Sequence, residues 1–146
     1  MKMNPDCIRD ILLCIEEETW RNHPCWFLDE DLIDIAQLIG IFDDTPEYQN
    51  VLYRNYTYDI LLEHLDLCFE AELIVPYDSP VDYRDRIWVS KLSLKGHEFL
   101  AHTRPQPMWD KIKIQLNQCG ALTISTLVQL SATNAFGEAL NILQAL

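Results

Sequence analysis

A row of carboxylates recurs at helical spacing in the stretch YTYDILLEHLDLCFEAELI, residues 56–74. Successive members lie four, three and four positions apart, which at about 100° per residue places them on one helix face. The members of this acidic row are Asp59, Glu63, Asp66 and Glu70, with Tyr58 at the edge. Because the stretch contains no Lys or Arg, such a face attracts a basic protein surface and repels phosphate.

Arginine and aromatic residues form a second candidate site further along the chain. Its members are Tyr83, Arg84, Arg86 and Trp88. Arginines beside aromatic rings can grip a phosphate or enter a minor groove. The same arginines can instead form ion pairs with Asp78 and Asp82 of their own loop, and the sequence leaves both alternatives open.

Patterns typical of catalysis or metal binding are weak. The five cysteines are odd in number and form no Cys-x-x-Cys pair, so we interpret them as small apolar residues in a reducing compartment. The chain carries no glycine-rich phosphate loop and no Gly-x-Ser-x-Gly motif. We therefore predict a protein that is not an enzyme, with no catalytic residue, no metal site and no cofactor.

The composition is that of a folded acidic protein. The 146 residues are 49% hydrophobic and carry a net charge of −12. From residue 29 to residue 85 there are fifteen acids and two bases, whereas residues 86–146 hold six bases and three acids. No apolar run approaches the roughly 20 residues that span a bilayer, and no signal segment opens the chain, so we expect a cytoplasmic protein without membrane contact.

Three helices are predicted in the first half. The first runs over about 5–19 with Asn4 or Asp6 as its cap, and the second over about 29–39. The third begins at Thr57 and ends within 72–74, burying Leu61, Leu65 and Cys68 opposite the acidic row. Between these helices we interpret HPCWF, residues 23–27, as a break. FDDTPEYQN is interpreted as a connector, followed by VLYRN as a short strand or an extended approach to the third helix.

A hairpin is predicted after the third helix. IWVSKLSL, residues 87–94, reads as one strand and LIVPY, residues 73–77, as its antiparallel partner, with a long tip between them. Three helices followed by a two-stranded hairpin is winged-helix order, in which the third helix occupies the DNA reader's place. The fold class is therefore mainly α (α+β): a winged-helix domain over 1–104, with a C-terminal helical extension over 105–146.

The C-terminal extension is nearly free of charge. After Lys113 the only charged residue is Glu138, although many large apolar residues follow. A helix without charges on either face is usually covered. The extension can pack back on the domain or against a second copy of the chain, and we favour a homodimer through this helix.

Three segments resemble a known family: DCIRDILLCIEEE, LLEHLDLCFEAELI, and KLSLKGHEFLAHTRPQPMWDKIKIQL. They are similar to the domain of unknown function 2513 family, whose members are common in phages and prophages. The GHEFL segment, from Gly96 to Leu100, is its most specific motif. Glu72 stands where the family prefers Gly, and Ser93 where it prefers Thr. The resemblance implies a winged-helix-like fold and a mobile-element origin, and it implies no activity.

The charge of the acidic row decides between two functions. A DNA-reading helix brings Arg, Lys, Asn or Gln to the base edges, whereas this helix would bring four carboxylates toward the phosphate backbones on both sides of the groove. We therefore predict a non-enzymatic acidic winged-helix protein of phage or prophage origin that modulates a basic host or phage factor by protein–protein interaction. The alternatives are a dimeric DNA-binding regulator that contacts DNA through its wing, and a row that is only a solvated face.

Overall fold

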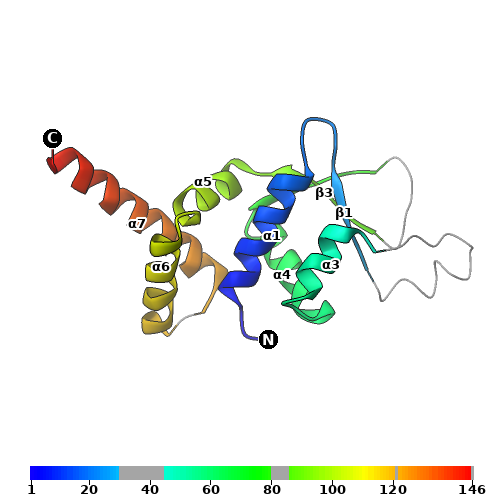
Figure 1. Cartoon of the computed structure of the whole chain (residues 1–146), viewed down its shortest axis with the longest axis horizontal. Coiled ribbons are helices and arrows are strands. Elements are labelled where there is room, and N and C mark those ends of the chain that lie inside the picture. Colours follow the sequence, from blue (N-terminus) through cyan, green and yellow to red (C-terminus); the bar gives the residue numbers. More distant parts are fainter. Residues whose placement is uncertain (30–44, 80–85, 121, 146) are drawn as a thin grey trace, which may run out of the picture.

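A small antiparallel sheet packs beside a larger set of helices in the computed structural model of this chain (Figure 1). The structure describes residues 1–29, 45–79, 86–120 and 122–145. Its helices are α1 (Pro5–Glu18), α3 (Glu47–Tyr53), α4 (Tyr58–Glu70), α5 (Leu94–Thr103), α6 (Gln106–Cys119) and α7 (Ile124–Ala145). Its strands are β1 (Cys25–Leu28), β2 (Ile74–Pro76) and β3 (Arg86–Leu92). The predicted mainly helical α+β fold is confirmed.

The predicted hairpin is present, but it belongs to a larger sheet. The strands lie in the order β1-β3-β2, and both pairings are antiparallel. Strand β1 was missed, since residues 23–27 were interpreted as a break after Pro24. Cys25 pairs with Val89 and Leu28 with Arg86, so this strand is specified by a partner some sixty residues away. Its residues CWFL show no apolar–polar alternation, and its partner is too far along the chain for a hairpin pattern to reveal it.

The predicted extended segment over 51–55 is also wrong, because residues 47–53 form α3. Two side chains of this short helix bond the outer edge of β1. The Tyr48 hydroxyl accepts from the Trp26 amide at 3.0 Å and donates to the Trp26 carbonyl. The fully buried Gln49 side chain accepts from the Leu28 amide at 2.7 Å and donates to its carbonyl at 3.0 Å. These tertiary bonds stabilise a helix that is too short to persist alone.

The first helix follows its prediction closely. Asn4 caps it, its side-chain oxygen accepting from the Asp6 amide at 3.0 Å. The predicted apolar stripe is buried, as its members Ile8, Ile11, Leu12 and Ile15 are fully inaccessible. The stripe packs into a core that also receives residues of α4, α5, β1 and β3. Helix α1 is therefore the central element on which the others converge.

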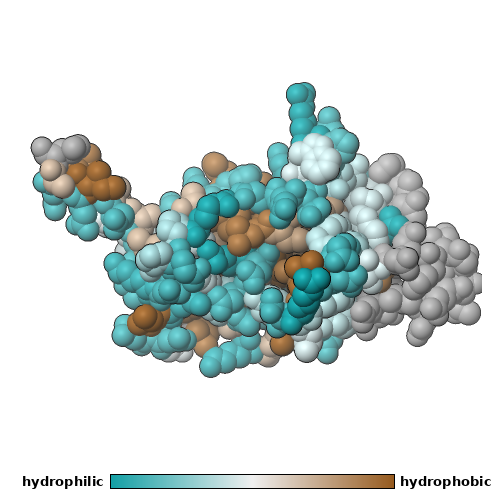
Figure 2. Space-filling view, in the orientation of Figure 1, coloured by the Kyte–Doolittle hydropathy of each residue, from teal (hydrophilic) through white to brown (hydrophobic). Residues whose placement is uncertain are grey.

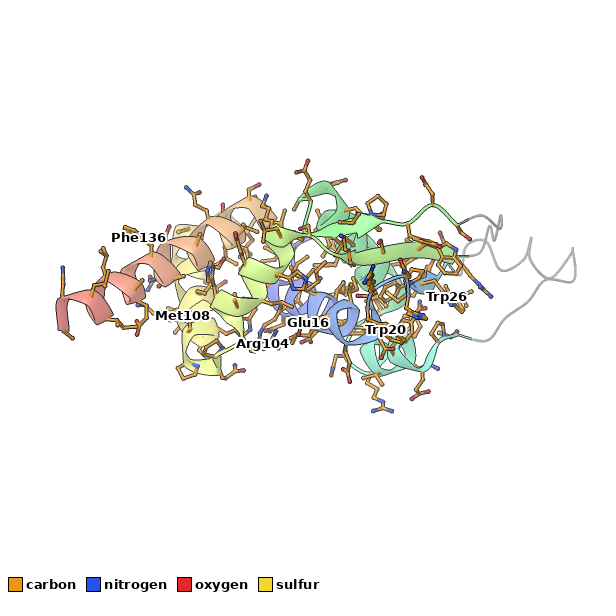
Figure 3. The ribbon with its side chains drawn as sticks, turned by 90° about the horizontal axis from the view of Figure 1, so that it is seen from above. Glu16, Trp20, Trp26, Arg104, Met108 and Phe136 are labelled. Carbon is orange, nitrogen blue, oxygen red and sulfur yellow. The ribbon has the colours of Figure 1, made fainter. Side chains whose placement is uncertain are left out.

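Helix α6 and the beginning of α7 share this same core. Trp109, Ile112, Leu116 and Leu127 are all buried in it. The Asp6 carboxylate accepts from the Trp109 indole nitrogen at 2.9 Å and pairs with Lys113 at 3.1 Å. The chain upstream of α6 is tied to α1 as well, because Arg104 donates to both carboxylate oxygens of Glu16 at 2.8 Å (Figure 3). The division at residue 104 stays a prediction.

The order of the described elements from α1 to β3 is helix, strand, helix, helix, strand, strand. This order is compatible with the predicted winged helix, with α4 in the third-helix position. The predicted second helix over 29–39 and the hairpin tip at 80–85 lie outside the described residues, apart from Asp29.

Within the described ranges, none of the helices combines the length and the apolar character needed to cross a bilayer.

Candidate functional site

The acidic row lies on α4 and faces solvent, as predicted. Thr57 caps the helix, its hydroxyl accepting from the Ile60 amide at 3.4 Å. All four carboxylates of the row are exposed, whereas Leu61, Leu65 and Cys68 on the opposite face are fully buried. The helical periodicity therefore placed every member of the row correctly.

A buried histidine on α4 was missed. His64 is fully inaccessible, and its Nε2 accepts from the Asn4 amide at 2.7 Å. Its Nδ1 lies 2.7 Å from the Ile60 carbonyl and donates to it, which defines one neutral tautomer. The ring thus joins the start of α1 to the middle of α4. The spacing of His64 from Leu61, Leu65 and Cys68 is helical, so the same periodicity indicated its burial.

The C-terminal end of α4 closes in a left-handed turn. Glu72, which stands where the family prefers Gly, has a φ of 59°. The Leu73 amide donates to the Cys68 carbonyl at 3.0 Å and the Glu72 amide to the Phe69 carbonyl at 3.0 Å, the two bonds of a Schellman motif. Leu73 and Cys68 are both fully buried, which adds the apolar contact of that motif. The helix end is therefore sharp despite the missing glycine.

Helix α5 begins against this turn and holds it in place. A Cβ on Gly96 would lie 2.1 Å from the Leu73 carbonyl oxygen, so only glycine fits this position. Ser93 caps α5 and also donates to the Glu72 carbonyl at 2.6 Å. Lys95 donates to the Ala71 carbonyl at 3.1 Å. The most specific family motif, GHEFL, thus begins at the contact that fixes the end of the acidic helix.

A further carboxylate joins the acidic row from β1. Asp29, just after the strand, accepts from the Tyr58 hydroxyl at 2.8 Å. Burial and the neighbouring carboxylates of Glu70, Asp29 and Glu63 raise the pKa of Asp66. The negative charges are therefore close enough to disfavour one another. The sequence placed Asp29 in the first turn of another helix, and only the tertiary fold brings it to this face.

The second candidate site is partly described. Tyr83 and Arg84 lie outside the described residues. The Arg86 guanidinium stacks 4.0 Å above the Trp26 ring and lies 5.8 Å from the Trp88 ring. Burial lowers the pKa of Arg86. Trp88 also contacts Tyr77, with ring centroids 5.8 Å apart.

Neither alternative foreseen for Arg86 includes its stacking on Trp26. The cross-strand pair Trp26–Trp88 places both indoles on the face that carries this arginine. The side chain is thus held over an aromatic surface of the sheet. The sequence could not show this arrangement, because it depends on a strand that the sequence did not reveal.

A second acidic surface lies between α1 and α3. A groove of about 560 Å³ lies between these helices. Its walls combine the carboxylates of Asp10, Glu17, Glu18 and Glu47 with apolar side chains that include Leu13 and Val51. The sequence did not predict this groove, because its second wall is the helix that was interpreted as an extended segment.

The buried thiols of Cys7 and Cys25 offer little reactivity. Burial raises the pKa of Cys7 and of Cys25 to about 12, so both are protonated at neutral pH. No group of three metal-binding side chains occurs within the ranges that the structure describes.

Comparison with known proteins adds the family. A family model described as "Hypothetical protein (DUF2513)" matches residues 2–122. No curated protein and no solved structure matches the chain. The matched residues include α1, α4 and the Gly96 contact, and they cover most of the chain, which confirms the predicted resemblance. The protein therefore belongs to the DUF2513 family.

Proposed function

We propose that this chain is a winged-helix-like protein of phage or prophage origin that binds a basic surface of another protein through the acidic row and Asp29. Binding would mask or redirect a host or phage factor. The observation that carries this proposal is the gathering of five carboxylates around α4, where burial and then the charges of Glu70, Asp29 and Glu63 raise the pKa of Asp66. A cationic partner would relieve the mutual repulsion of these carboxylates. The unfavourable repulsion in the unbound protein would therefore add to the favourable free energy of binding.

Rigidity of the helix supports the same proposal. Thr57 caps one end of α4, the turn at Glu72 closes the other, and His64 ties the middle to α1. The carboxylates therefore project from a backbone that is already ordered. Because little backbone entropy is lost when such a face is covered, the charge pattern can act as a specific docking surface.

Electrostatics argue against DNA reading by this helix. A major groove about 12 Å wide would bring the row close to phosphates on both sides. Screening at physiological salt acts over about 8 Å and is weaker where water is excluded. The α4 sequence supplies no Lys or Arg to neutralise phosphate. Shape and charge thus point to different ligands, and the charge favours a protein.

A charge-reversal experiment tests the acidic row. The probe is a fluorescent lysine-rich peptide, whose binding is followed by anisotropy at low and at physiological salt. We expect Asp59→Lys with Asp66→Lys to weaken binding by about tenfold or more. The matched control is Glu98→Lys with Asp110→Lys, which changes the net charge equally at two exposed sites on α5 and α6.

The control decides how the result is interpreted. If both double variants lose affinity equally, only net charge matters, and the proposed face is wrong. Reversal of Glu17 and Glu47 then asks whether the groove between α1 and α3 binds the peptide instead.

DNA binding through the wing remains the rival function, and a salt titration with duplex DNA separates the two. Phosphate contacts give an affinity that falls steeply as salt rises, with a slope that reports the number of phosphates neutralised. Tight wild-type binding to duplex DNA that is lost in Arg86→Ala would replace the protein-binding proposal by the DNA-binding one. We expect no such binding at about 50 mM salt.

A further inference from the structure

The C-terminal half of α7 projects from the body of the protein (Figure 1), and its large apolar side chains are exposed. Figure 2 shows hydrophobic surface on this projecting segment. The exposed fractions are 67% for Phe136, 40% for Leu140, 58% for Ile142 and 64% for Leu143. By contrast, Leu127 near the start of the same helix is fully buried in the core. Uncovered apolar surface of this kind marks an interaction site.

The exposed residues form one continuous sector around α7. Phe136, Leu140 and Leu143 recur at i, i+4 and i+7, so they make a ridge along one side of the helix. On the same wheel Ile142 lies about 100° from Leu143, on the side that faces the rest of the molecule. The small residues Ala135 and Ala139 fall between Ile142 and the ridge. The sector is therefore a shallow channel with an apolar wall on each side.

The channel continues into a groove between α7 and the start of α6. This groove has a volume of about 550 Å³, and its apolar walls include Pro107, Met108, Ala135, Ala139 and Ile142. Figure 3 shows Met108 on α6 and Phe136 on α7 at the same end of the molecule. The ridge and the groove thus lie side by side, so one element can fill the groove while it packs on the ridge.

Charge selects the occupant. Helix α7 carries a single charged residue, Glu138, so a highly charged partner finds almost nothing to pair with on it. The whole chain has a net charge of −12, but residues 86–146 hold six bases and three acids. Two copies of this chain therefore repel each other over most of their surface and least at this end.

From these observations we infer that the channel on α7 is covered by α7 of a second copy. The two helices pack antiparallel about a twofold axis near Ala139, with Phe136 of one copy beside Leu143 of the other. Such an isologous contact lets one ridge meet the other's channel without a second type of protein. The antiparallel arrangement also keeps the two acidic α4 faces at opposite ends of the dimer.

The size of the contact sets its expected strength. A helical segment of about 14 residues is roughly 21 Å long and about 10 Å wide. The strip that it offers is smaller than the approximately 800 Å² per partner of a standard stable interface. We therefore expect a dimer with a dissociation constant on the order of micromolar rather than nanomolar.

The test is the molar mass of the full chain in solution. Sedimentation equilibrium and light scattering over about 1–100 µM should show a concentration-dependent dimer of the wild-type protein. Phe136→Glu with Leu143→Glu should raise the dissociation constant by at least about 100-fold and leave a monomer. The matched control is Leu94→Glu with Ile114→Glu, which adds the same charges at apolar residues that are 76% and 59% exposed outside α7. Circular dichroism checks that both variants keep their helices.

A cross-link tests the twofold axis in the same protein. In a Cys119→Ser background, Ala139→Cys should form a disulfide-linked dimer rapidly on mild oxidation, and the same substitution at Leu94 should not. A wild-type chain that stays monomeric, or a double glutamate variant that still dimerises, overturns the inference. So does equal weakening by the control variant. A monomer that instead binds neutral phospholipid vesicles through α7 would assign this surface to lipid and equally overturn it.

Discussion

Helices α4 and α7 both expose a continuous face, but the chain supports them differently. Helix α4 is capped at Thr57 and ends in the turn at Glu72, and the hydrogen bond from the Asn4 amide to His64 joins it to the start of α1. Helix α7 is packed near its beginning and exposed along its second half. The face of α4 is all carboxylate, and that of α7 is almost without charge. The charged face is thus presented by a rigid support, while the apolar face depends on a partner for its cover.

The largest expected effect comes from a substitution that disturbs the contact supporting the C-terminal end of α4. Gly96→Ala places a methyl group against the Leu73 carbonyl, where the Cβ would be 2.1 Å from the oxygen. Since the clash is with backbone, we expect a loss of about 3 kcal/mol or more in the free energy of unfolding. Urea denaturation measures this loss.

Gly137→Ala is the matched control for that experiment. It adds the same methyl group in α7, where nothing lies within 4 Å of the new Cβ. Because glycine disfavours a helix interior, this variant should gain about 0.5–1 kcal/mol. Equal effects at the two glycines would contradict the tight support of α4.

Removing the histidine should have the next largest effect. His64→Leu fills the site with an apolar side chain of similar size, but it leaves the Asn4 amide without its acceptor in a partly buried site. A lost acceptor of this kind costs about 1–3 kcal/mol. Hydrogen exchange at the start of α1 should speed up more than exchange within α7. An unchanged exchange rate at Asn4 and Cys7 would show that the bond does not hold α1 to α4.

The turn at Glu72 offers a stabilising change. Glycine adopts a positive φ without steric cost, so Glu72→Gly should raise the free energy of unfolding by about 0.5–1 kcal/mol. Thermal unfolding detects this gain. Glu72→Gln is the control, since it removes the charge but keeps a side chain at a φ of 59°. A gain of equal size in the glutamine variant would assign the effect to charge instead of to the backbone.

The smallest expected effect concerns Asp66, whose charged form is disfavoured by burial and then by the neighbouring carboxylates. The pKa of Asp66 is raised in the folded protein, so folded Asp66 binds a proton more readily than unfolded Asp66. Stability from this group is therefore present at low pH and is lost as pH rises through the raised pKa. Asp66→Asn should stabilise the protein at neutral pH by a few tenths of a kcal/mol, the scale of exposed charge pairs.

The pH dependence provides the check on Asp66. The gain of the asparagine variant should shrink when unfolding is measured below pH 3.8, the ordinary value for this carboxyl group. A gain that is independent of pH would mean that the cost of the charged form of Asp66 is not its source.

Sequence patterns sufficed wherever an element is long and its periodicity is local. The buried stripe of α1 and the acidic row follow from spacing alone, and the three-residue β2 was found because its partner β3 comes next in the chain as a hairpin. Strand β1 and helix α3 have four and seven residues, and each is stabilised by the other through Tyr48 and Gln49. No local window contains that information. For the same reason Asp29 and Trp26, both at β1, were absent from the predicted sites.

The bonds that Tyr48 and Gln49 make to β1 also determine how the sheet can grow. An edge strand with open amides and carbonyls is a template on which an extended segment of another chain can add. Here two side chains occupy the outward amides and carbonyls of Trp26 and Leu28. That edge is closed to β-augmentation, and amyloid-like stacking through it would first require α3 to detach. The seven-residue helix α3 thus covers the outer edge of the four-residue strand β1, and it disfavours pairing of that edge with another chain as well as stabilising the fold.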